Sequence, residues 1–237
     1  MAYNLEKFQQ GLKDLNLSLD EKQINQFITY YEMLVEKNKV MNLTAITEFD
    51  EVIEKHFLDS LSLCKVMDLD TEISVLDMGT GAGFPGIPLK IAFPKLNVVL
   101  ADSLNKRILF LDEVIAELGL EKIETIHARA EELGRNKEYR EKFDLVVSRA
   151  VANLASLNEY CLPFAAIGGK FISYKSGEIE EEVTNAKNSV FLLGGKVKDI
   201  FKFDLYEQKR SFVVIEKVKG TPKTYPRKAG TPTKTPL

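Results

Sequence analysis

A run of alternating glycines between a predicted strand and a predicted helix constrains this chain more than any other feature. A strand ends at Asp77, glycines follow at Gly79, Gly81 and Gly83, and a helix begins near Pro85. Glycine lets the backbone turn sharply, and it lets a ligand approach closely because no Cβ stands in the way. The order of strand, glycine loop and helix therefore predicts a ligand site at the carboxyl edge of a parallel sheet.

Strands and helices alternate over most of the chain from residue 73 onward. The predicted strands cover 73–77, 96–101, 122–127, 143–148, 170–174, 196–203 and 211–218, and the predicted helices cover 85–93, 105–118, 153–166 and 178–190. This alternation is typical of a mostly parallel sheet with helices on both faces, and the last two strands should pair as a hairpin. We therefore expect a three-layer, Rossmann-like α/β fold with a mostly parallel seven-stranded sheet.

The first seventy residues show helical periodicity, with apolar residues at spacings of three and four. Ser18 and Glu21 have the spacing of a capping box, which predicts the start of the second helix. A third helix is expected over 49–67. We expect residues 1–70 to form an N-terminal helical extension packed on a core of residues 71–218, within a single structural domain.

The C-terminal end is basic although the whole chain carries a formal net charge of −3. From Lys209 onward there are eight basic residues and one acid, Glu216. Residues 219–237 hold four of the eight prolines and no acid, so we expect a basic Pro/Thr-rich tail that is extended. A basic end on an acidic body permits phosphate binding. The candidate RNA contacts are Lys223, Arg227, Lys228 and Lys234.

Several protein classes are excluded by what the 237 residues lack. Two cysteines and two histidines at unrelated spacings indicate neither a disulfide framework nor a metal site. No apolar run has the length of a transmembrane helix, and charged residues interrupt the first twenty positions, unlike a signal-peptide core. We expect a cytoplasmic monomer that binds neither a membrane nor a metal.

The acids around the glycine loop indicate which ligand it binds. Asp102 closes the second predicted strand nineteen residues after Gly83, where a carboxylate can accept both hydroxyls of a ribose. Gly81, Gly83 and Gly86 also match the dinucleotide fingerprint, and a glycine turn with no ligand is a further alternative. However, Asp77 at the loop would repel a pyrophosphate and attract the ammonium group of a methionine moiety. The pattern therefore favours S-adenosylmethionine.

Further motifs extend along the chain, and two of them are specific: the Gly-Phe-Pro-Gly continuation of the glycine loop and a Pro-Arg-Lys-x-Gly-x-Pro element near the C-terminus. The full set is Asn42–Thr44, His56–Ser60, Asp77–Gly86, Ala128–Glu132, Ser148–Ala150 and Tyr225–Pro232. On these segments the sequence resembles the ribosomal small-subunit methyltransferase G family, also called glucose-inhibited division protein B, over essentially its whole length.

The resemblance implies a class I S-adenosylmethionine-dependent methyltransferase fold and methyl transfer from S-adenosylmethionine to N7 of a guanine in small-subunit (16S) ribosomal RNA. The implied partner is 16S ribosomal RNA or the small ribosomal subunit. By matching position, Gly79 and Phe84 line the methionine and sulfonium end, Asp102 holds the ribose, Ala130 and Glu131 flank the adenine, and Arg149 faces the cofactor and the guanine. The expected cofactor-binding residues are Asp77, Gly79, Gly81, Gly83, Phe84, Asp102, Ala130, Glu131 and Arg149.

Each of these roles has a plainer alternative. Residues 130–132 could simply begin a short helix, with acids near its positive end. Arg149 could form a structural ion pair with Asp144 or another acid. His56 and Asp59, three residues apart on a helix, suggest a packing or capping contact more than a catalytic dyad. Guanine N7 already presents a lone pair, so no general base is needed and we assign no catalytic acid or base.

Three other functions are weighed against ribosomal RNA methylation. The first is methylation of a protein or small molecule, against which the basic tail argues. The second is a nicotinamide-dependent oxidoreductase, disfavoured by Asp77 and by the lack of a substrate domain. The third is a cofactor-binding assembly protein without turnover. The modified guanine, the choice between naked RNA and an assembled subunit, and the existence of a second nucleotide site stay open.

Overall fold

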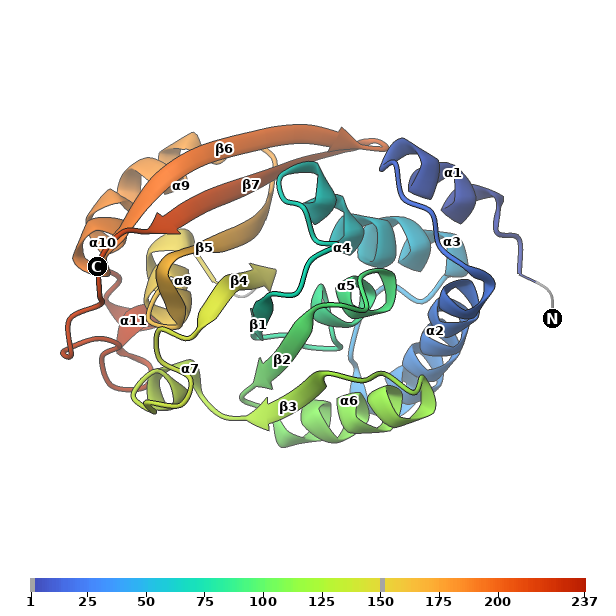
Figure 1. The fold of residues 1–237 in the computed structure, drawn as a ribbon, viewed down its shortest axis with the longest axis horizontal. Coiled ribbons are helices and arrows are strands. Elements are labelled where there is room, and N and C mark those ends of the chain that lie inside the picture. Colours follow the sequence, from blue (N-terminus) through green and yellow to red (C-terminus); the bar gives the residue numbers. More distant parts are fainter. Residues whose placement is uncertain (1–2, 150–151) are drawn as a thin grey trace.

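One seven-stranded sheet with strand order β3-β2-β1-β4-β5-β7-β6 organises the molecule (Figure 1). The computed structural model describes residues 3–149 and 152–237, so Ala150 of the resemblance lies outside the described residues. The strands are β1 (Ser74–Met78), β2 (Asn97–Asp102), β3 (Ile123–His127), β4 (Phe143–Arg149), β5 (Ala165–Ser176), β6 (Gly195–Leu205) and β7 (Gln208–Lys217). The first five strands are parallel and the β6–β7 hairpin adds antiparallel pairing at one edge, which confirms the expected fold class.

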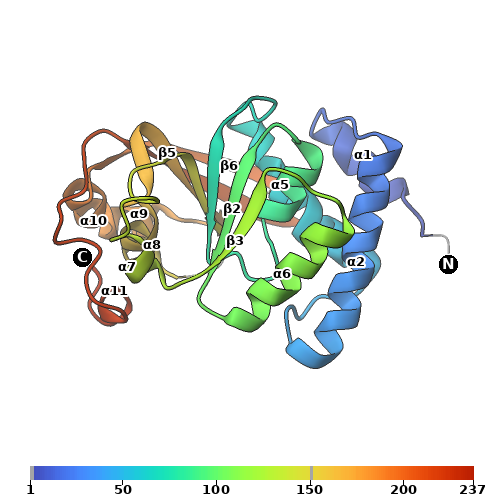
Figure 2. The ribbon, with the colours of Figure 1, turned by 60° about the horizontal axis from the view of Figure 1, so that its bottom comes forward.

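Helices cover both faces of the sheet and form the outer layers (Figure 2). They are α1 (Glu6–Asp14), α2 (Glu21–Met41), α3 (Phe49–Val52), α4 (Asp59–Leu61), α5 (Gly86–Ala92), α6 (Asn105–Glu117), α7 (Ala130–Leu133), α8 (Leu154–Cys161), α9 (Glu180–Asn185), α10 (Lys187–Leu192) and α11 (Thr231–Lys234). Two predicted helices differ from the observed ones: the one over 153–166 was too long, since α8 ends at Cys161 and β5 begins at Ala165, and the one over 178–190 is divided at Ala186 into α9 and α10.

Alternation along the strands divides the core into two clusters, one on each face of the sheet. In β1, Val75 packs in the first cluster, with α2, α5 and α6, whereas Leu76 packs in the second, with α8 and α10. Both side chains are fully buried, as expected for a parallel strand covered on both faces. The sheet edge that carries the glycine loop therefore lies between two fixed helical layers.

The second helix begins two residues later than Ser18 and Glu21 predict. The capping box is made by Asp20, whose carboxylate accepts the Gln23 backbone N–H at 2.8 Å, while the Gln23 side chain accepts the Asp20 N–H at 2.9 Å. The Gln23 amide also donates to the carbonyl of Ile91 at 2.7 Å. This contact across 68 residues ties the helix start to α5, and spacing along the chain alone could not reveal it.

The predicted third helix is one helical segment with an irregular centre. A π-helical turn, η1 (Ile53–Leu58), separates α3 from α4, and a 3₁₀ turn, η2 (Ser62–Lys65), follows. A π turn inserts one extra residue, and such turns often occur at functional sites. In this chain the π turn carries His56 and leads directly into Asp59.

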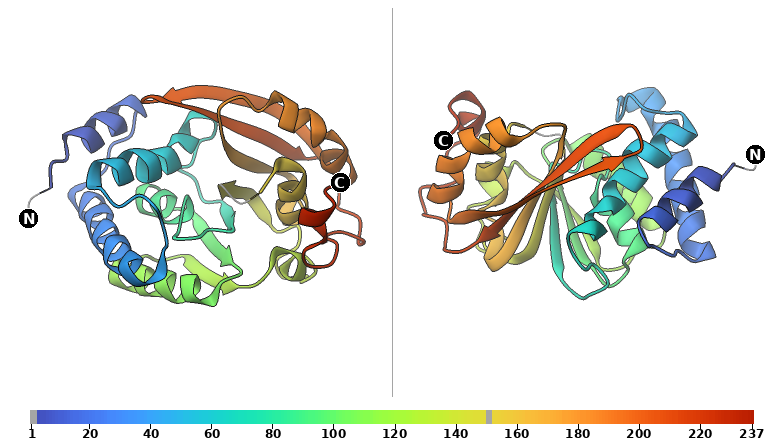
Figure 3. Two further views of the ribbon diagram at one scale, coloured as in Figure 1. Left: turned by 180° about the vertical axis from the view of Figure 1, so that it is seen from behind. Right: turned by 90° about the horizontal axis from the view of Figure 1, so that it is seen from above.

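The β6–β7 hairpin reaches across to the N-terminal helices, as Figures 1 and 3 show. At its tip, the Tyr206 hydroxyl donates to the backbone carbonyl of Lys7 at 3.4 Å. The N-terminal helices and the β6–β7 hairpin are therefore in contact at this end of the sheet.

The expectation of an extended, unpacked tail was wrong. Residues 219–237 lie against α7 and α8, Pro226 and Pro232 are buried, and α11 forms near the end. The Arg140 guanidinium donates to the carbonyls of Thr221 and Tyr225 at 2.7 and 2.9 Å. Proline-rich sequence without acids resembles a disordered end in composition, but here its carbonyls are held by side chains of the preceding layer.

Candidate functional site

A cavity of about 690 Å³ opens at the carboxyl edge of the sheet, where the sequence places the ligand site. We call it the edge cavity. The glycine loop, the ends of β2 and β4, the start of α7 and part of the C-terminal segment line it. The expected site residues that line it are Gly79, Gly81, Phe84, Asp102, Ala130, Glu131 and Arg149.

Asp77 and Gly83 are not among the lining residues, because Asp77 lies beneath the loop and Gly83 packs against α2. The Asp77 Oδ2 atom accepts the Thr80 hydroxyl at 2.7 Å and the Gly86 N–H at 2.8 Å. Asp77 is completely buried, and this burial raises its pKa to about 6. Its carboxylate therefore ties the loop together from below, and this differs from the expected attraction of an ammonium group in the cavity.

Gly83 is a packing position. Its φ is +107°, and a Cβ there would lie 2.7 Å from the Tyr30 hydroxyl oxygen and 2.7 Å from Ile87 Cγ1. The same hydroxyl donates to the Ala82 carbonyl at 2.5 Å. The loop is thus pressed against α2, so an N-terminal helix fixes part of the cavity floor.

Asp102 stands at the end of β2 with its carboxylate in the cavity wall. Its Oδ2 accepts the Gly81 N–H at 3.0 Å and pairs with the Arg107 guanidinium at 3.1 Å, and its Oδ1 accepts the Leu104 N–H at 2.9 Å. A carboxylate has about four acceptor positions, so one position stays open for a ribose hydroxyl. The geometry fits a nucleoside that enters beside the loop.

Ala130 and Glu131 begin the short helix α7, so the alternative interpretation of this segment as a helix start is confirmed, and both residues also line the cavity. Glu131 is 7 % exposed, and its Oε1 accepts the Gly230 N–H at 2.9 Å. One oxygen of this carboxylate is therefore used to hold the C-terminal segment beside the cavity.

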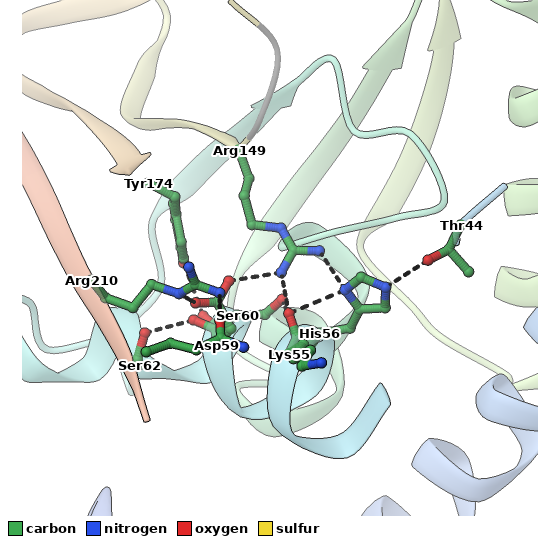
Figure 4. Close-up of polar contacts among 10 residues, drawn as sticks. Thr44, Lys55, His56, Asp59, Ser60, Ser62, Arg149, Tyr174 and Arg210 are labelled. Carbon is green, nitrogen blue, oxygen red and sulfur yellow. Dashed lines mark hydrogen bonds and ion pairs between the residues drawn. The ribbon is translucent and has the colours of Figure 1, made fainter. Parts of the chain in front are cut away.

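Arg149 at the end of β4 forms an ion pair, but with Asp59 at 2.8 Å and not with Asp144 (Figure 4). Its Nη1 also donates to the Lys55 carbonyl at 3.1 Å, and its guanidinium lies 5.0 Å from the centre of the Phe84 ring. The pair spans 90 residues of sequence, which is why spacing could not identify the partner.

His56 and Asp59 both contact arginine side chains (Figure 4). The Asp59 carboxylate bridges Arg149 and Arg210, with the Arg210 Nε 2.7 Å from its other oxygen. The His56 ring lies between the Thr44 hydroxyl, 2.8 Å from Nε2, and Arg149, 3.2 Å from Nδ1. Burial and the nearby Arg149 charge lower the pKa of His56 to about 4, so the ring is neutral near pH 7. The interpretation of the two residues as a packing contact fits these contacts.

The four candidate RNA contacts in the C-terminal segment divide into two groups. Arg227 is not available, because its Nε and Nη2 atoms bind both carboxylate oxygens of Glu159, which is completely buried. Lys223, Lys228 and Lys234 are exposed, and no ion pair forms for them within the described residues. Sequence reasoning missed that Gly230 and Thr233 line the edge cavity.

Two features are absent from the part of the chain that the structure describes. None of its helices is long and apolar enough to cross a lipid bilayer. Its His, Cys, Asp and Glu side chains form no group of three or more that could hold a metal ion.

Residues 23–213 match the family model described as rRNA small subunit methyltransferase G. A relative from Lachnoclostridium phytofermentans named "Ribosomal RNA small subunit methyltransferase G" is 56% identical over 232 residues, 97% of this chain and 96% of the relative. One of the same name from Alkaliphilus metalliredigens is 51% identical and covers 96% of each chain.

Solved structures support the fold at much lower identity. TrmN from Thermus thermophilus superposes with a TM-score of 0.53 at 17% identity, over 70% of this chain and 53% of that one. TYW2 from M. jannaschii, solved in complex with AdoMet, gives a TM-score of 0.51 at 19% identity, over 62% and 71% of the two chains.

Proposed function

The chain belongs to the rRNA small subunit methyltransferase G family, and from this premise we propose that it transfers a methyl group from S-adenosylmethionine to N7 of a guanine in 16S ribosomal RNA. The single observation that carries the proposal is the edge cavity, in which a glycine loop and a strand-end carboxylate meet as a nucleoside-containing cofactor requires. The proposed place of action is the cytoplasm, and the proposed active form is a monomer.

The residues of the edge cavity fit the cofactor, and we assign them accordingly. Asp102 would hold the ribose, Ala130 would leave room for a flat ring, and the second oxygen of Glu131 would accept the exocyclic amine of the adenine. The loop residues Gly79 and Gly81 would lie along the methionine portion, with Phe84 at the sulfonium end. When bound, S-adenosylmethionine supplies an electrophilic methyl group.

The remaining task of this chain is to position the acceptor. Guanine N7 is nucleophilic without loss of a proton, so no side chain has to act as a base. Holding two reactants in line can by itself contribute about 7–11 kcal/mol to lowering a barrier. We assign this role to Arg149, which is fixed by Asp59 and lies over Phe84 at the wall of the edge cavity.

The test uses labelled S-adenosylmethionine and small subunits from cells that lack the gene. We expect label in 16S ribosomal RNA, released by chain cleavage specific for 7-methylguanine. Naked 16S ribosomal RNA from the same cells is tested in parallel, to identify the form of the substrate. Label in protein would show that the acceptor is a protein and not RNA. Cofactor binding without methyl transfer to the small subunits or to naked RNA would favour an assembly role without turnover.

A further inference from the structure

A second cavity of about 490 Å³ adjoins the edge cavity and shares His56 and Arg149 with it. We call it the arginine cavity. It lies between the π turn η1, the end of β5 and the start of β7. The side chains that line it include Lys175, Glu182, Phe203, Gln208, Arg210 and Phe212. Its volume is in the range of small-molecule sites.

We propose that the arginine cavity receives the acceptor guanosine of the RNA, with Arg149 at the boundary between acceptor and cofactor. This inference rests on the proposed function. Methyl transfer needs the acceptor atom in line with the donor, so the acceptor has to occupy space continuous with the edge cavity. A third cavity, between α2 and the end of α6, shares no lining residue with the other two.

The charge of the arginine cavity suits an anionic ligand. Four cations line it against two carboxylates, the cations being Lys55, Arg149, Lys175 and Arg210. The Asp59 carboxylate is used by two arginines, one on each oxygen. Within the described residues the Nη1 atom of Arg210 has no hydrogen-bond partner, since Nε binds Asp59 and Nη2 binds Gln208. An unused guanidinium N–H in a cationic hollow is a ready donor for an RNA phosphate.

Aromatic rings form part of the cavity wall. Phe203 and Phe212 are stacked with ring centres 5.0 Å apart, and Phe212 meets Tyr174 edge-on at 4.8 Å. Phe212 and Tyr174 are buried, and of the three rings only Phe203 is partly exposed. RNA-binding proteins commonly combine an accessible aromatic ring, against which an unstacked base lies, with cations that hold its backbone. The Phe203 ring and the four cations, beside a cofactor site, favour a flipped-out nucleotide over a free inorganic anion.

Two substitutions in the arginine cavity test the proposal, and both lie outside the edge cavity. Arg210→Gln removes the charge and the unused donor. Lys175→Met removes a cation that touches neither Asp59 nor Arg149, since its Nζ contacts Glu182 and the Ala152 carbonyl. Lys202→Met is the matched control, because Lys202 is an exposed lysine on β6 that lines neither cavity.

Calorimetry gives the dissociation constant of S-adenosylmethionine, and methyl transfer to 16S ribosomal RNA at saturating cofactor gives kcat and KM for the RNA. We expect Arg210→Gln and Lys175→Met to lower kcat/KM for RNA by about 10-fold or more, as for loss of one charge-assisted contact. Their cofactor affinity should stay within about twofold of the wild type, a change below 0.5 kcal/mol by the tenfold-per-1.4 kcal/mol conversion. Lys202→Met should match the wild type in both measurements.

Full activity of both cavity variants would overturn the proposal, and so would a loss of cofactor affinity as large as the loss of transfer. If Arg210→Gln fails to fold because Asp59 loses a partner, Lys175→Met alone decides between these outcomes. The activity of the wild type tests the proposed function separately from the proposed acceptor site. If it transfers no methyl group to RNA, the proposed function fails, whereas normal transfer by every variant removes only the acceptor site.

Discussion

The partly buried His56 and the completely buried Asp77 are titratable groups whose shifted pKa values act on stability in opposite directions. The pKa of His56 falls from 6.5 to about 4, because burial and the Arg149 charge disfavour the imidazolium. The pKa of Asp77 rises from 3.8 to about 6, because burial disfavours the carboxylate more than its two hydrogen bonds favour it. Both pKa shifts act over nearly the same interval of pH, so their opposite effects on the free energy of unfolding largely cancel in the wild type.

The sign of each effect on the free energy of unfolding depends on whether the folded or the unfolded chain binds more protons. Between pH 6.5 and 4 the unfolded chain protonates His56 first, so acidification lowers the free energy of unfolding through this residue. Between pH 6 and 3.8 the folded chain protonates Asp77 first, so the same acidification raises it. At about 1.4 kcal/mol per pKa unit, each effect is on the order of 3 kcal/mol.

Two variants separate these effects. His56→Gln should become more stable relative to the wild type as the pH falls from 6.5 to 4, and Asp77→Asn should become less stable relative to it from 6 to 4. The measurement is urea unfolding at half-unit steps of pH, compared as differences from the wild type so that other carboxylates cancel. Parallel curves for all three proteins would show that neither group has a shifted pKa.

Among the helices, α2 is the element that supports the glycine loop from outside the sheet. Tyr30 is completely buried, and its hydroxyl holds the Ala82 carbonyl in the loop. Tyr30→Phe would leave that buried carbonyl without its donor, at a cost of about 1–3 kcal/mol. Since Ala82 lines the edge cavity, we also expect S-adenosylmethionine to bind about 3- to 10-fold more weakly, an estimate from part of the same cost.

Tyr31→Phe is the control for this prediction. Tyr31 follows Tyr30 in α2, but its hydroxyl donates to the Thr47 carbonyl at 2.9 Å, away from the loop. Calorimetric titration should find its cofactor affinity equal to that of the wild type. Equal affinities of Tyr30→Phe and Tyr31→Phe would mean that the loop holds its shape without α2.

The C-terminal segment is the second element that supports the cavity. Arg227 pairs with the buried Glu159 and so anchors the stretch that carries Gly230 and Thr233 to the cavity wall. Arg227→Met would leave the Glu159 charge buried and unpaired, and removal of one partner of such a pair costs about 3–5 kcal/mol. We expect a loss of stability of that order together with weaker cofactor binding, measured by urea unfolding and calorimetry.

A second substitution and a control make this prediction specific. The double variant Arg227→Met, Glu159→Met removes both charges and should recover most of the lost stability. Lys228→Met changes the exposed neighbour and should alter neither quantity. If the Arg227→Met protein is fully stable and binds the cofactor normally, the C-terminal segment does not support the cavity, and only its proposed role in RNA binding would remain.

The elements that could be predicted from sequence are those with local signals. The strands β1 and β2 and the helix α5 follow from apolar runs, glycines and prolines, and their observed bounds lie close to the predicted ones. The attachment of Gln23 to α5 and the packed C-terminal segment depend on contacts between distant residues. No local pattern distinguishes Asp20 from Ser18 as a helix cap, because both side chains are good caps.

The same limit applies within the candidate site. The positions of Gly79 and Asp102 follow from the strand–loop–helix order, and both line the cavity. Asp77 belongs to the same motif but lies below the loop, since the side chain of a strand-end residue can point to either face. The Asp59–Arg149–Arg210 bridge joins three elements and has no signal in any of them.

At the scale of the molecule, the two chain ends support one site. Tyr30 touches the glycine loop from the N-terminal side, and Gly230 binds Glu131 from the C-terminal side. We propose on this ground that residues 1–70, 71–218 and 219–237 are parts of a single domain. Because the whole chain has a net charge of −3, RNA binding has to rely on local groups of cations. The exposed lysines of the C-terminal segment form one such group.

The salt dependence of RNA binding tests those lysines apart from the segment that carries them. Each phosphate contact with single-stranded nucleic acid contributes about −0.7 to the slope of log K against log salt. Replacing Lys223, Lys228 and Lys234 by Met should therefore make the slope for 16S ribosomal RNA shallower by about 2. Cofactor affinity should not change, because these side chains line neither cavity. An unchanged slope would leave RNA recognition to the arginine cavity and surfaces around it.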